Sequence, residues 1–89
     1  MMSLLRSNLP SLDLHGESSD IARVLVKEFI SDNYKLNKKE IIIIHGIGTG
    51  VIKETVHKEL KNNVLVSSYK IDPFNIGTTI VYLKDKKDV

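Results

Sequence analysis

The chain has 89 residues, of which 42% are hydrophobic, and a formal net charge of +2, so it can build one small core but not two. It has no cysteine, which excludes disulfides and thiolate chemistry, and no charged-then-apolar leader, which favours a cytoplasmic protein. No apolar run approaches the roughly 20 residues that span a bilayer, so we expect no membrane partner, and the charge is too small to prove a polyanion partner by itself.

The N-terminal segment predicts an arm followed by a short strand. Residues 1–11 have no sustained period and include Pro10, so we expect a flexible arm. From Leu12 to His15 apolar and polar residues alternate, which in a strand sends the two leucines to the core and Asp13 and His15 to the other face.

A helix is predicted next. Gly16 ends the strand, Ser18 is a good N-cap, and Asp20 suits the positive end of the helix dipole. The helix should run to about Asn33 and turn one broad apolar stripe toward a sheet. The residues of this stripe are Ile21, Ala22, Leu25, Val26, Phe29 and Ile30.

A second strand and helix follow a polar link at residues 34–39. The β-branched run at residues 40–44 is typical of a central strand buried on both faces. The fourfold spacing of Ile52, Val56 and Leu60 predicts an amphipathic helix over residues 51–62. Four polar residues, Lys53, His57, Lys58 and Lys61, lie off its inward line, and we expect His57 on the solvated face.

The remaining elements complete an α/β fold. Residues 64–71 and 78–83 read as strands, and the short connection at 72–77 makes them antiparallel. The order is therefore βαβαββ, a two-layer sandwich with a mixed four-stranded sheet. We expect one domain at residues 12–84 and a charged tail at 85–89.

Asp13 and His15 are candidate catalytic residues. They share a strand face at the carboxyl end of the strand, where open α/β sheets bind ligands. A histidine exchanges a proton near neutrality, and a neighbouring carboxylate can orient its ring. The alternative is structural, with His15 capping a loop and Asp13 bonding to backbone amides.

The glycine-rich run from His45 to Gly50 is a candidate phosphate-binding loop. Gly46, Gly48 and Gly50 lie between a strand and a helix, so backbone amides and the helix N-terminus can hold an anion. The run lacks the spacing of GxGxxG and the lysine of a Walker loop, so it is not a nucleotide-binding fingerprint. Lys53, in the first helical turn, favours a phosphate contact, while His45 either contacts phosphate or caps the turn.

A metal site stays open as an alternative. Asp13, His15 and His45 provide suitable ligand types, but no close-spaced set such as HExxH is present.

Two motifs in this order resemble the Smr domain, the small MutS-related module. They are LDLHG and IIIIHGIGTG, each followed by a helix, with GTTIVYL as the closing strand. The resemblance covers nearly the whole chain after Ser11. It implies a fold similar to the C-terminal domain of bacterial translation initiation factor three, nucleic-acid binding and, in many members, endonuclease activity. Met1-Met2 and the short lead favour a stand-alone protein.

The resemblance also assigns site residues. The family's LDxH motif falls on Leu12, Asp13 and His15, and its HGxGxG motif on His45, Gly46, Gly48 and Gly50. We expect Thr49, which lies within this run, to bind nucleic acid with it. Lys53 stands where the family commonly has a basic residue. Many members have arginine in place of His15, so histidine here resembles the cleavage-competent version. The family's glycine-rich approach to the last strand is reduced to residues 74–77, where we expect Phe74 to be partly buried, with base stacking as the alternative.

These observations favour an endonuclease, with RNA preferred over DNA. His15 would act as general base or acid, Asp13 would orient the His15 ring, and the glycine loop would bind a phosphate. A ribose 2′-hydroxyl can attack without metal, while water activated by Mg²⁺ or Mn²⁺ is the alternative route. A binding module without turnover, acting on nucleic acid or the ribosome, is the competing function, and a small-molecule phosphate enzyme is a third.

Overall fold

The computed structural model describes residues 8–88. Residues 1–7 of the expected N-terminal arm and residue 89 of the expected tail lie outside the described residues. In chain order the elements are β1 (Ser11–Asp13), α2 (Ser19–Lys35), β2 (Glu40–Ile44), α3 (Val51–Asn62), β3 (Val66–Asp72), β4 (Asn75–Leu83) and a short 3₁₀ turn, η1 (Lys86–Asp88).

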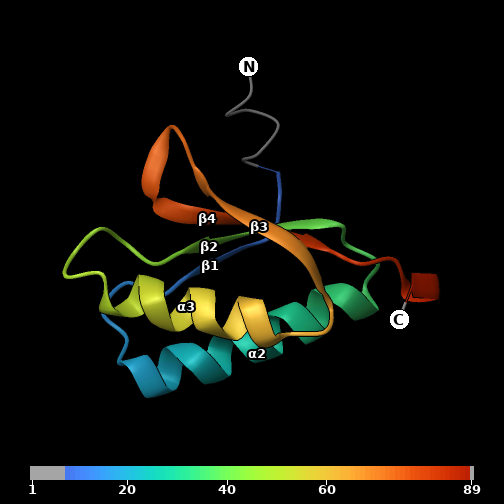
Figure 1. Cartoon of the computed structure of the whole chain (residues 1–89), viewed down its shortest axis with the longest axis horizontal. Helices are drawn as coiled ribbons and strands as arrows, with labels where there is room; N and C mark the ends of the chain where they lie inside the picture. Colours follow the sequence, from blue (N-terminus) through green and yellow to red (C-terminus); the bar gives the residue numbers. More distant parts are fainter. Residues whose placement is uncertain (1–7, 89) are drawn as a thin grey trace.

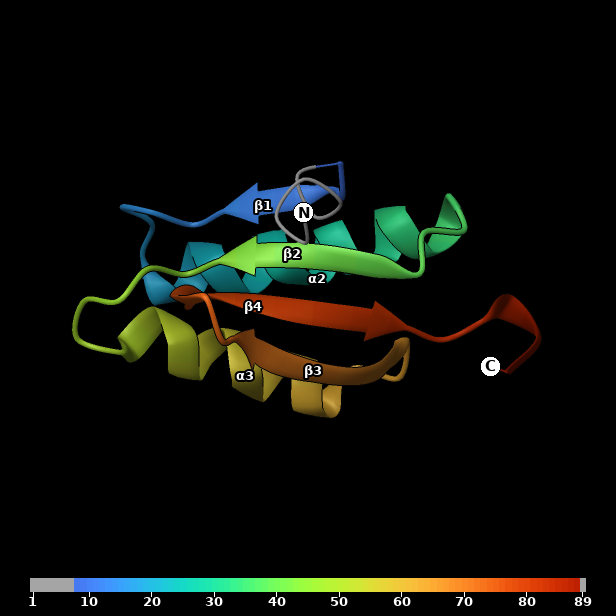
Figure 2. The same ribbon diagram turned by 90° about the horizontal axis from the view of Figure 1, so that it is seen from above.

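The four strands form one mixed sheet in the order β1-β2-β4-β3. β1 runs parallel to β2, whereas β4 is antiparallel to both β2 and β3. The last strand in the chain therefore lies in the interior of the sheet (Figure 2). The predicted βαβαββ order and the mixed four-stranded sheet are confirmed.

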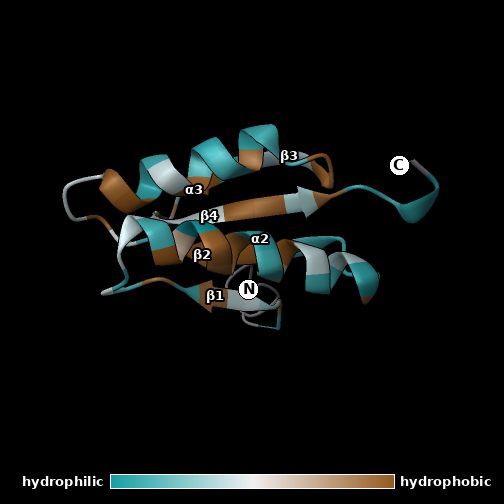
Figure 3. Cartoon of the chain, turned by 90° about the horizontal axis from the view of Figure 1, so that it is seen from below, coloured by the Kyte–Doolittle hydropathy of each residue, from teal (hydrophilic) through white to brown (hydrophobic). Residues whose placement is uncertain are grey.

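Both helices cover the same face of the sheet, and this makes the fold two-layered (Figure 1). Ile41 and Ile43 point to the helices and are fully buried, whereas Ile42 and Ile44 on the opposite face are half-buried. The expectation that β2 is buried on both faces is therefore wrong, because no helix packs on the second face. Apolar and polar residues are interspersed along both helices (Figure 3). The buried core consists of Leu14, Ala22, Val26, Ile30, Ile41, Ile43, Val56, Leu60, Val81 and Leu83.

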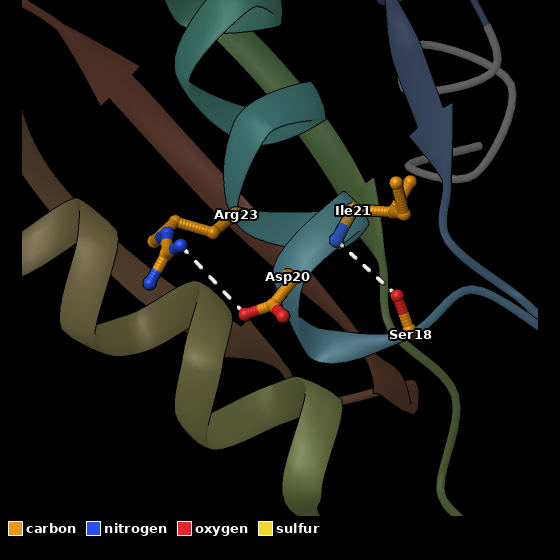
Figure 4. Close-up of polar contacts among 4 residues, drawn as sticks. All are labelled: Ser18, Asp20, Ile21 and Arg23. Atoms are coloured by element: carbon orange, nitrogen blue, oxygen red, sulfur yellow. Dashed lines mark hydrogen bonds and ion pairs between the residues drawn. The ribbon is translucent and has the colours of Figure 1, made fainter.

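The start of α2 follows the predicted cap. The hydroxyl of Ser18 accepts a 3.3 Å hydrogen bond from the amide of Ile21, and Asp20 makes an exposed 3.7 Å ion pair with Arg23 (Figure 4). The side chain of Ile21 is 50% exposed, so its predicted place on the inward stripe is wrong. The cap fixes the helix so that Ala22, not Ile21, faces the sheet. No helix within residues 8–88 is both long and apolar enough to cross a membrane.

A tight hairpin joins β3 to β4. The predicted connection of residues 72–77 is too long, because Asp72 already pairs with Asn75 and only Pro73 and Phe74 form the turn. The carboxylate of Asp72 accepts a 2.9 Å hydrogen bond from the Phe74 amide. Phe74 is 85% exposed, so the expected partial burial of this ring is wrong: the turn projects it beyond the sheet.

Candidate functional site

The loop after β1 and the loop after β2 meet at one end of the sheet. Asp13 pairs with Ile44 in the parallel register, so both strands deliver their next residues to the same edge (Figure 2). Between these loops lies an open cleft of about 460 Å³. Its lining residues are Leu14, His15, Gly16, His45, Gly46, Ile47, Gly48, Thr49, Gly50, Val51, Ile52 and Lys53. The structure thus brings His15 together with every predicted nucleic-acid-binding residue, while Asp13 does not line the cleft.

Asp13 and His15 interact through the backbone. The Asp13 carboxylate accepts a 2.9 Å hydrogen bond from the amide N–H of His15. The strand has ended by this point, since Leu14 makes the last link to β2 through the Ile44 carbonyl at 2.8 Å. The His15 side chain is exposed, and its imidazole has no hydrogen-bond partner among residues 8–88. The ring is therefore open to a ligand in the cleft, and Asp13 fixes the main chain beneath it.

The first and the last glycine of the loop both have a left-handed backbone conformation. Gly46 has a φ of 81° and Gly50 a φ of 88°, values that side chains with a Cβ rarely adopt. A Cβ built at either position meets nothing within 4 Å, so glycine is needed here for conformation and not for space. Gly50 is the N-cap of α3 and leaves the first-turn amides without a side-chain cap from its own position.

The N-terminus of α3 opens into this cleft. First-turn amides of an α-helix have no acceptor within the helix, and their dipoles favour an anion. Among the described residues, the Val51 amide has a side-chain partner in the Thr49 hydroxyl at 3.4 Å. Lys53, half-buried in the same turn, adds a positive charge to the cleft. The loop, the helix end and Lys53 together offer donors to one phosphate-sized group.

The tip of β4 holds the glycine loop, a contact that the sequence analysis missed. The Gly77 carbonyl accepts two hydrogen bonds of 2.9 Å, from the amides of His45 and Gly46. A Cβ at Gly77 would lie 3.2 Å from the Gly46 backbone. The one glycine in residues 74–77 was the feature of the sequence that could have indicated this contact.

His45 is buried beneath the loop, with 6% of its surface exposed. Its Nδ1 lies 2.9 Å from the Gly46 carbonyl and donates to it, and its Nε2 lies 2.8 Å from the Thr79 hydroxyl. Burial lowers the pKa of His45 below its usual 6.5. The hydrogen bond to Gly46 raises this pKa in part, and the charge of Lys53 lowers it further. Both ring nitrogens are thus engaged within the protein, which favours the turn-capping alternative for His45 over a phosphate contact.

His57 also faces inward, so the expectation of a solvated side chain is wrong. Its Nε2 lies 2.8 Å from the same Thr79 hydroxyl, and its ring contacts Tyr69 with centroids 5.1 Å apart. Burial lowers the pKa of His57, with smaller contributions from His45 and Lys53. His57 follows the buried Val56, and Thr79 is a hydroxyl residue in an apolar strand. The sequence indicated this contact only by a histidine next to a buried valine and a threonine in an apolar strand.

The described residues do not fit a metal site. Within residues 8–88, no group of three or more histidine, aspartate or glutamate side chains could hold a metal ion. His15 and His45 both line the cleft, but the carboxylate of Asp13 is used by the His15 amide.

Comparisons with known proteins agree on one family. A family model described as the Smr domain matches residues 12–84. An endonuclease MutS2 from Lachnoclostridium phytofermentans is 38% identical over 86 residues, which is 93% of this chain but 11% of that protein. One from Clostridium kluyveri is 37% identical over 83 residues, covering 90% of this chain and 11% of that protein. The chain thus spans about a tenth of the length of these relatives.

Two solved structures share the fold. The crystal structure of the Smr domain of Thermus thermophilus MutS2 superposes with a TM-score of 0.83 at 24% identity, covering 85% of this chain and 99% of that domain. YdaL, a stand-alone small MutS-related protein from Escherichia coli, gives a TM-score of 0.80 at 24% identity, covering 94% of this chain and 74% of that protein.

Proposed function

This chain belongs to the Smr domain family, and from that premise we propose that it is a nucleic-acid endonuclease that acts on RNA in preference to DNA. The observation that carries the proposal is the cleft that the exposed His15 lines together with the glycine loop and Lys53. An acid–base group and an anion-binding loop that line one cleft are what phosphodiester cleavage requires.

In the proposed complex the glycine loop binds the phosphate that is cut. The first-turn amides of α3 and the ammonium of Lys53 interact with the non-bridging phosphate oxygens, where negative charge grows in the transition state. The loop holds its shape without the ligand, because His45 and Gly46 are already bonded to Gly77. Such preorganised donors need little rearrangement as the charge develops.

His15 then acts as the general base. Its imidazole takes the proton of a ribose 2′-hydroxyl, the 2′-oxygen bonds to phosphorus, and the bond from phosphorus to the 5′-oxygen breaks. A proton from water neutralises the leaving 5′-oxygen. The products are a 2′,3′-cyclic phosphate and a 5′-hydroxyl. No step of this route uses a metal, and the preference for RNA follows from the 2′-hydroxyl that DNA lacks.

Asp13 supports His15 through the main chain in this proposal. Its carboxylate accepts the His15 amide at 2.9 Å and thereby sets the path of the chain after β1. The ring of His15 is positioned by that backbone and not by a direct carboxylate contact. This differs from the expectation that Asp13 orients the imidazole itself.

A second candidate function is a binding module without turnover, directed to structured nucleic acid or the ribosome. It is favoured by the absence of any hydrogen-bond partner for the His15 ring within residues 8–88, because an unassisted imidazole is a weaker base. The small net charge of +2 also suits a protein that binds through a few phosphate contacts.

The experiment compares wild type with His15→Ala on end-labelled structured RNA and on DNA of the same sequence, in EDTA or with added Mg²⁺ or Mn²⁺. We expect RNA cleavage in EDTA that leaves cyclic phosphate ends and is lost in the variant, while affinity changes little. A single 2′-deoxy substitution at the cut site serves as the substrate control and should stop cleavage there.

Two outcomes would contradict this proposal. Equal cleavage of DNA and RNA would exclude attack by the 2′-hydroxyl. Binding without cleavage by wild type under all these conditions would favour the binding module instead. Amide NMR spectra of both proteins establish that the variant is folded.

A further inference from the structure

A single hydroxyl bridges the buried His45 and the partly buried His57. The Nε2 atoms of His45 and His57 each lie 2.8 Å from Oγ1 of Thr79. Thr79 is fully buried, and the two imidazole rings stand at 88° to one another with centroids 5.8 Å apart. His45 follows the end of β2, His57 lies on α3 and Thr79 lies on β4, so this chain of hydrogen bonds ties the start of the glycine loop to one helix and one strand.

The hydrogen-bond partners fix the direction of this chain. The Gly46 carbonyl can only accept, so the 2.9 Å contact requires a proton on Nδ1 of His45. Nε2 of the neutral ring then has a lone pair, and the Thr79 hydroxyl donates its one proton to it. The Thr79 oxygen in turn accepts from Nε2–H of His57. The two histidines therefore hold opposite tautomers.

We propose that Thr79 and His57 are positioning residues for the glycine loop, acting through the tautomer of His45. This inference rests on the proposed function, because the loop is the part of the site that would bind phosphate. By occupying Nε2 of His45, Thr79 directs the ring proton to Nδ1 and thus to the Gly46 carbonyl. His57 fixes the rotation of the Thr79 hydroxyl. The shared result is one orientation of the peptide between Gly46 and Ile47.

The consequence for binding is geometric. Because the Gly46 carbonyl oxygen is held by Nδ1 of His45, it is kept from turning into the cleft, where it would repel an anion. The amide that follows it belongs to the same peptide plane and points the opposite way. His57 reaches Thr79 from a site beyond the cleft lining, and Tyr69 packs against its ring. Neither His57 nor Thr79 therefore needs to touch the substrate.

The first measurement uses the wild-type protein alone. Long-range ¹H–¹⁵N correlation of ¹⁵N-labelled protein above pH 7 distinguishes protonated from bare ring nitrogens. We expect the proton on Nδ1 of His45 and on Nε2 of His57, with the exposed His15 as an internal comparison. A proton on Nε2 of His45 would overturn the proposal whatever the protein binds.

The second measurement uses a matched pair of variants. Thr79→Val keeps the shape of threonine but removes the hydroxyl, whereas Thr79→Ser keeps the hydroxyl. We expect mixed tautomers of His45 and faster amide exchange at residues 46–50 in Thr79→Val only. Binding of a fluorescein-labelled single-stranded RNA should weaken about tenfold in Thr79→Val and stay near wild type in Thr79→Ser. His57→Phe, which keeps a ring without an N–H, should give an intermediate loss.

The outcomes separate this proposal from the function on which it rests. If wild type binds RNA and Thr79→Val binds it equally well with unchanged amide exchange, the positioning role is wrong and the proposed function stands. If wild type binds no RNA, the amide exchange of residues 46–50 is the deciding measurement. Faster exchange in Thr79→Val and not in Thr79→Ser supports the positioning role, whereas unchanged exchange in Thr79→Val overturns that role. If Thr79→Val does not fold, the wild-type tautomers and His57→Phe provide the test.

Discussion

Gly77 packs directly against Gly46, and its carbonyl accepts a 2.9 Å hydrogen bond from the Gly46 amide. The first residue belongs to the last strand and the second to the glycine loop, so the position of the loop is set by a distant part of the chain. A Cβ at position 77 would stand 3.2 Å from both Cα and the carbonyl carbon of Gly46. The neighbour is backbone, which cannot rotate away as a flexible side chain can.

Gly77→Ala should therefore displace the loop. We expect a loss of about 1–3 kcal/mol in the free energy of unfolding, the usual range for overpacking, with weaker RNA binding. Urea denaturation and the amide chemical shifts of His45 and Gly46 measure the two effects. Gly46→Ala is the comparison, since its cost of about 1–2 kcal/mol comes from left-handed backbone and not from crowding. A Gly77→Ala protein with wild-type stability and loop shifts would contradict this account.

The role of Asp13 can be tested by keeping or removing its acceptor oxygen. Asp13→Asn retains an oxygen for the His15 amide, and Asp13→Ala does not. We expect Asp13→Ala to lose about 1 kcal/mol of stability and most of the RNA cleavage, while Asp13→Asn stays close to wild type in both. Loss of cleavage in Asp13→Asn with unchanged stability would instead indicate that the carboxylate charge acts on the His15 ring.

Lys53 should contribute one phosphate contact. Lys53→Ala is expected to weaken RNA binding and to reduce the slope of log K against log salt by about one. Lys58→Ala is the matched control, because Lys58 lies on the same helix, is exposed and does not line the cleft. Fluorescence anisotropy titrations at several salt concentrations measure both. Equal changes in the two variants would mean that general charge, and not the cleft, attracts RNA.

Stability should decrease as the pH falls below about 6.5. Burial lowers the pKa of His45 and of His57 from that usual value, so the unfolded chain binds protons before the folded one does. The stabilisation is full above the unfolded pKa and is lost as pH falls through the lowered folded values. Lys53 and Tyr69 are the other titratable groups at these rings.

Urea denaturation at a series of pH values from 7.5 to 4.5 checks this decrease. Asp85, whose pKa is lowered from 3.8 by Lys39, loses its contribution only in more acidic solution, so it does not obscure the window. His57→Phe should show a shallower decrease than wild type. A wild-type stability that stays flat across this window would contradict the burial of neutral histidines.

Regular patterns in the sequence predicted the elements that depend on local spacing. The run at residues 40–44 and the fourfold spacing from Ile52 to Leu60 gave β2 and α3 at their observed bounds. The hairpin was less predictable. Pro73 suggested a long loop, whereas the structure makes a two-residue turn in which the carboxylate of Asp72 satisfies the Phe74 amide.

The site was predictable where it follows chain order and unpredictable where it depends on packing. A strand followed by His15 and a strand followed by the glycine loop meet because parallel strands end at one edge. In contrast, the contact of Gly77 with Gly46 and the bridge of Thr79 between His45 and His57 depend on β4 lying beside β2. No pattern within one segment predicts that β4 pairs with β2. The position of His57 among polar residues of a helix likewise predicted an exposed side chain.

The interior position of β4 affects how the protein matures as it is synthesised. Translation completes both loops of the cleft, with His15 and the glycine run, before it reaches Gly77 and Thr79. A nascent chain that has only reached α3 carries the whole lining of the cleft but lacks the strand that anchors it. Only when β4 docks beside β2, bringing β3 with it, is the glycine loop held in place. The anchor of the cleft is thus supplied by the last of the four strands to be synthesised, and a chain that ends after α3 lacks it.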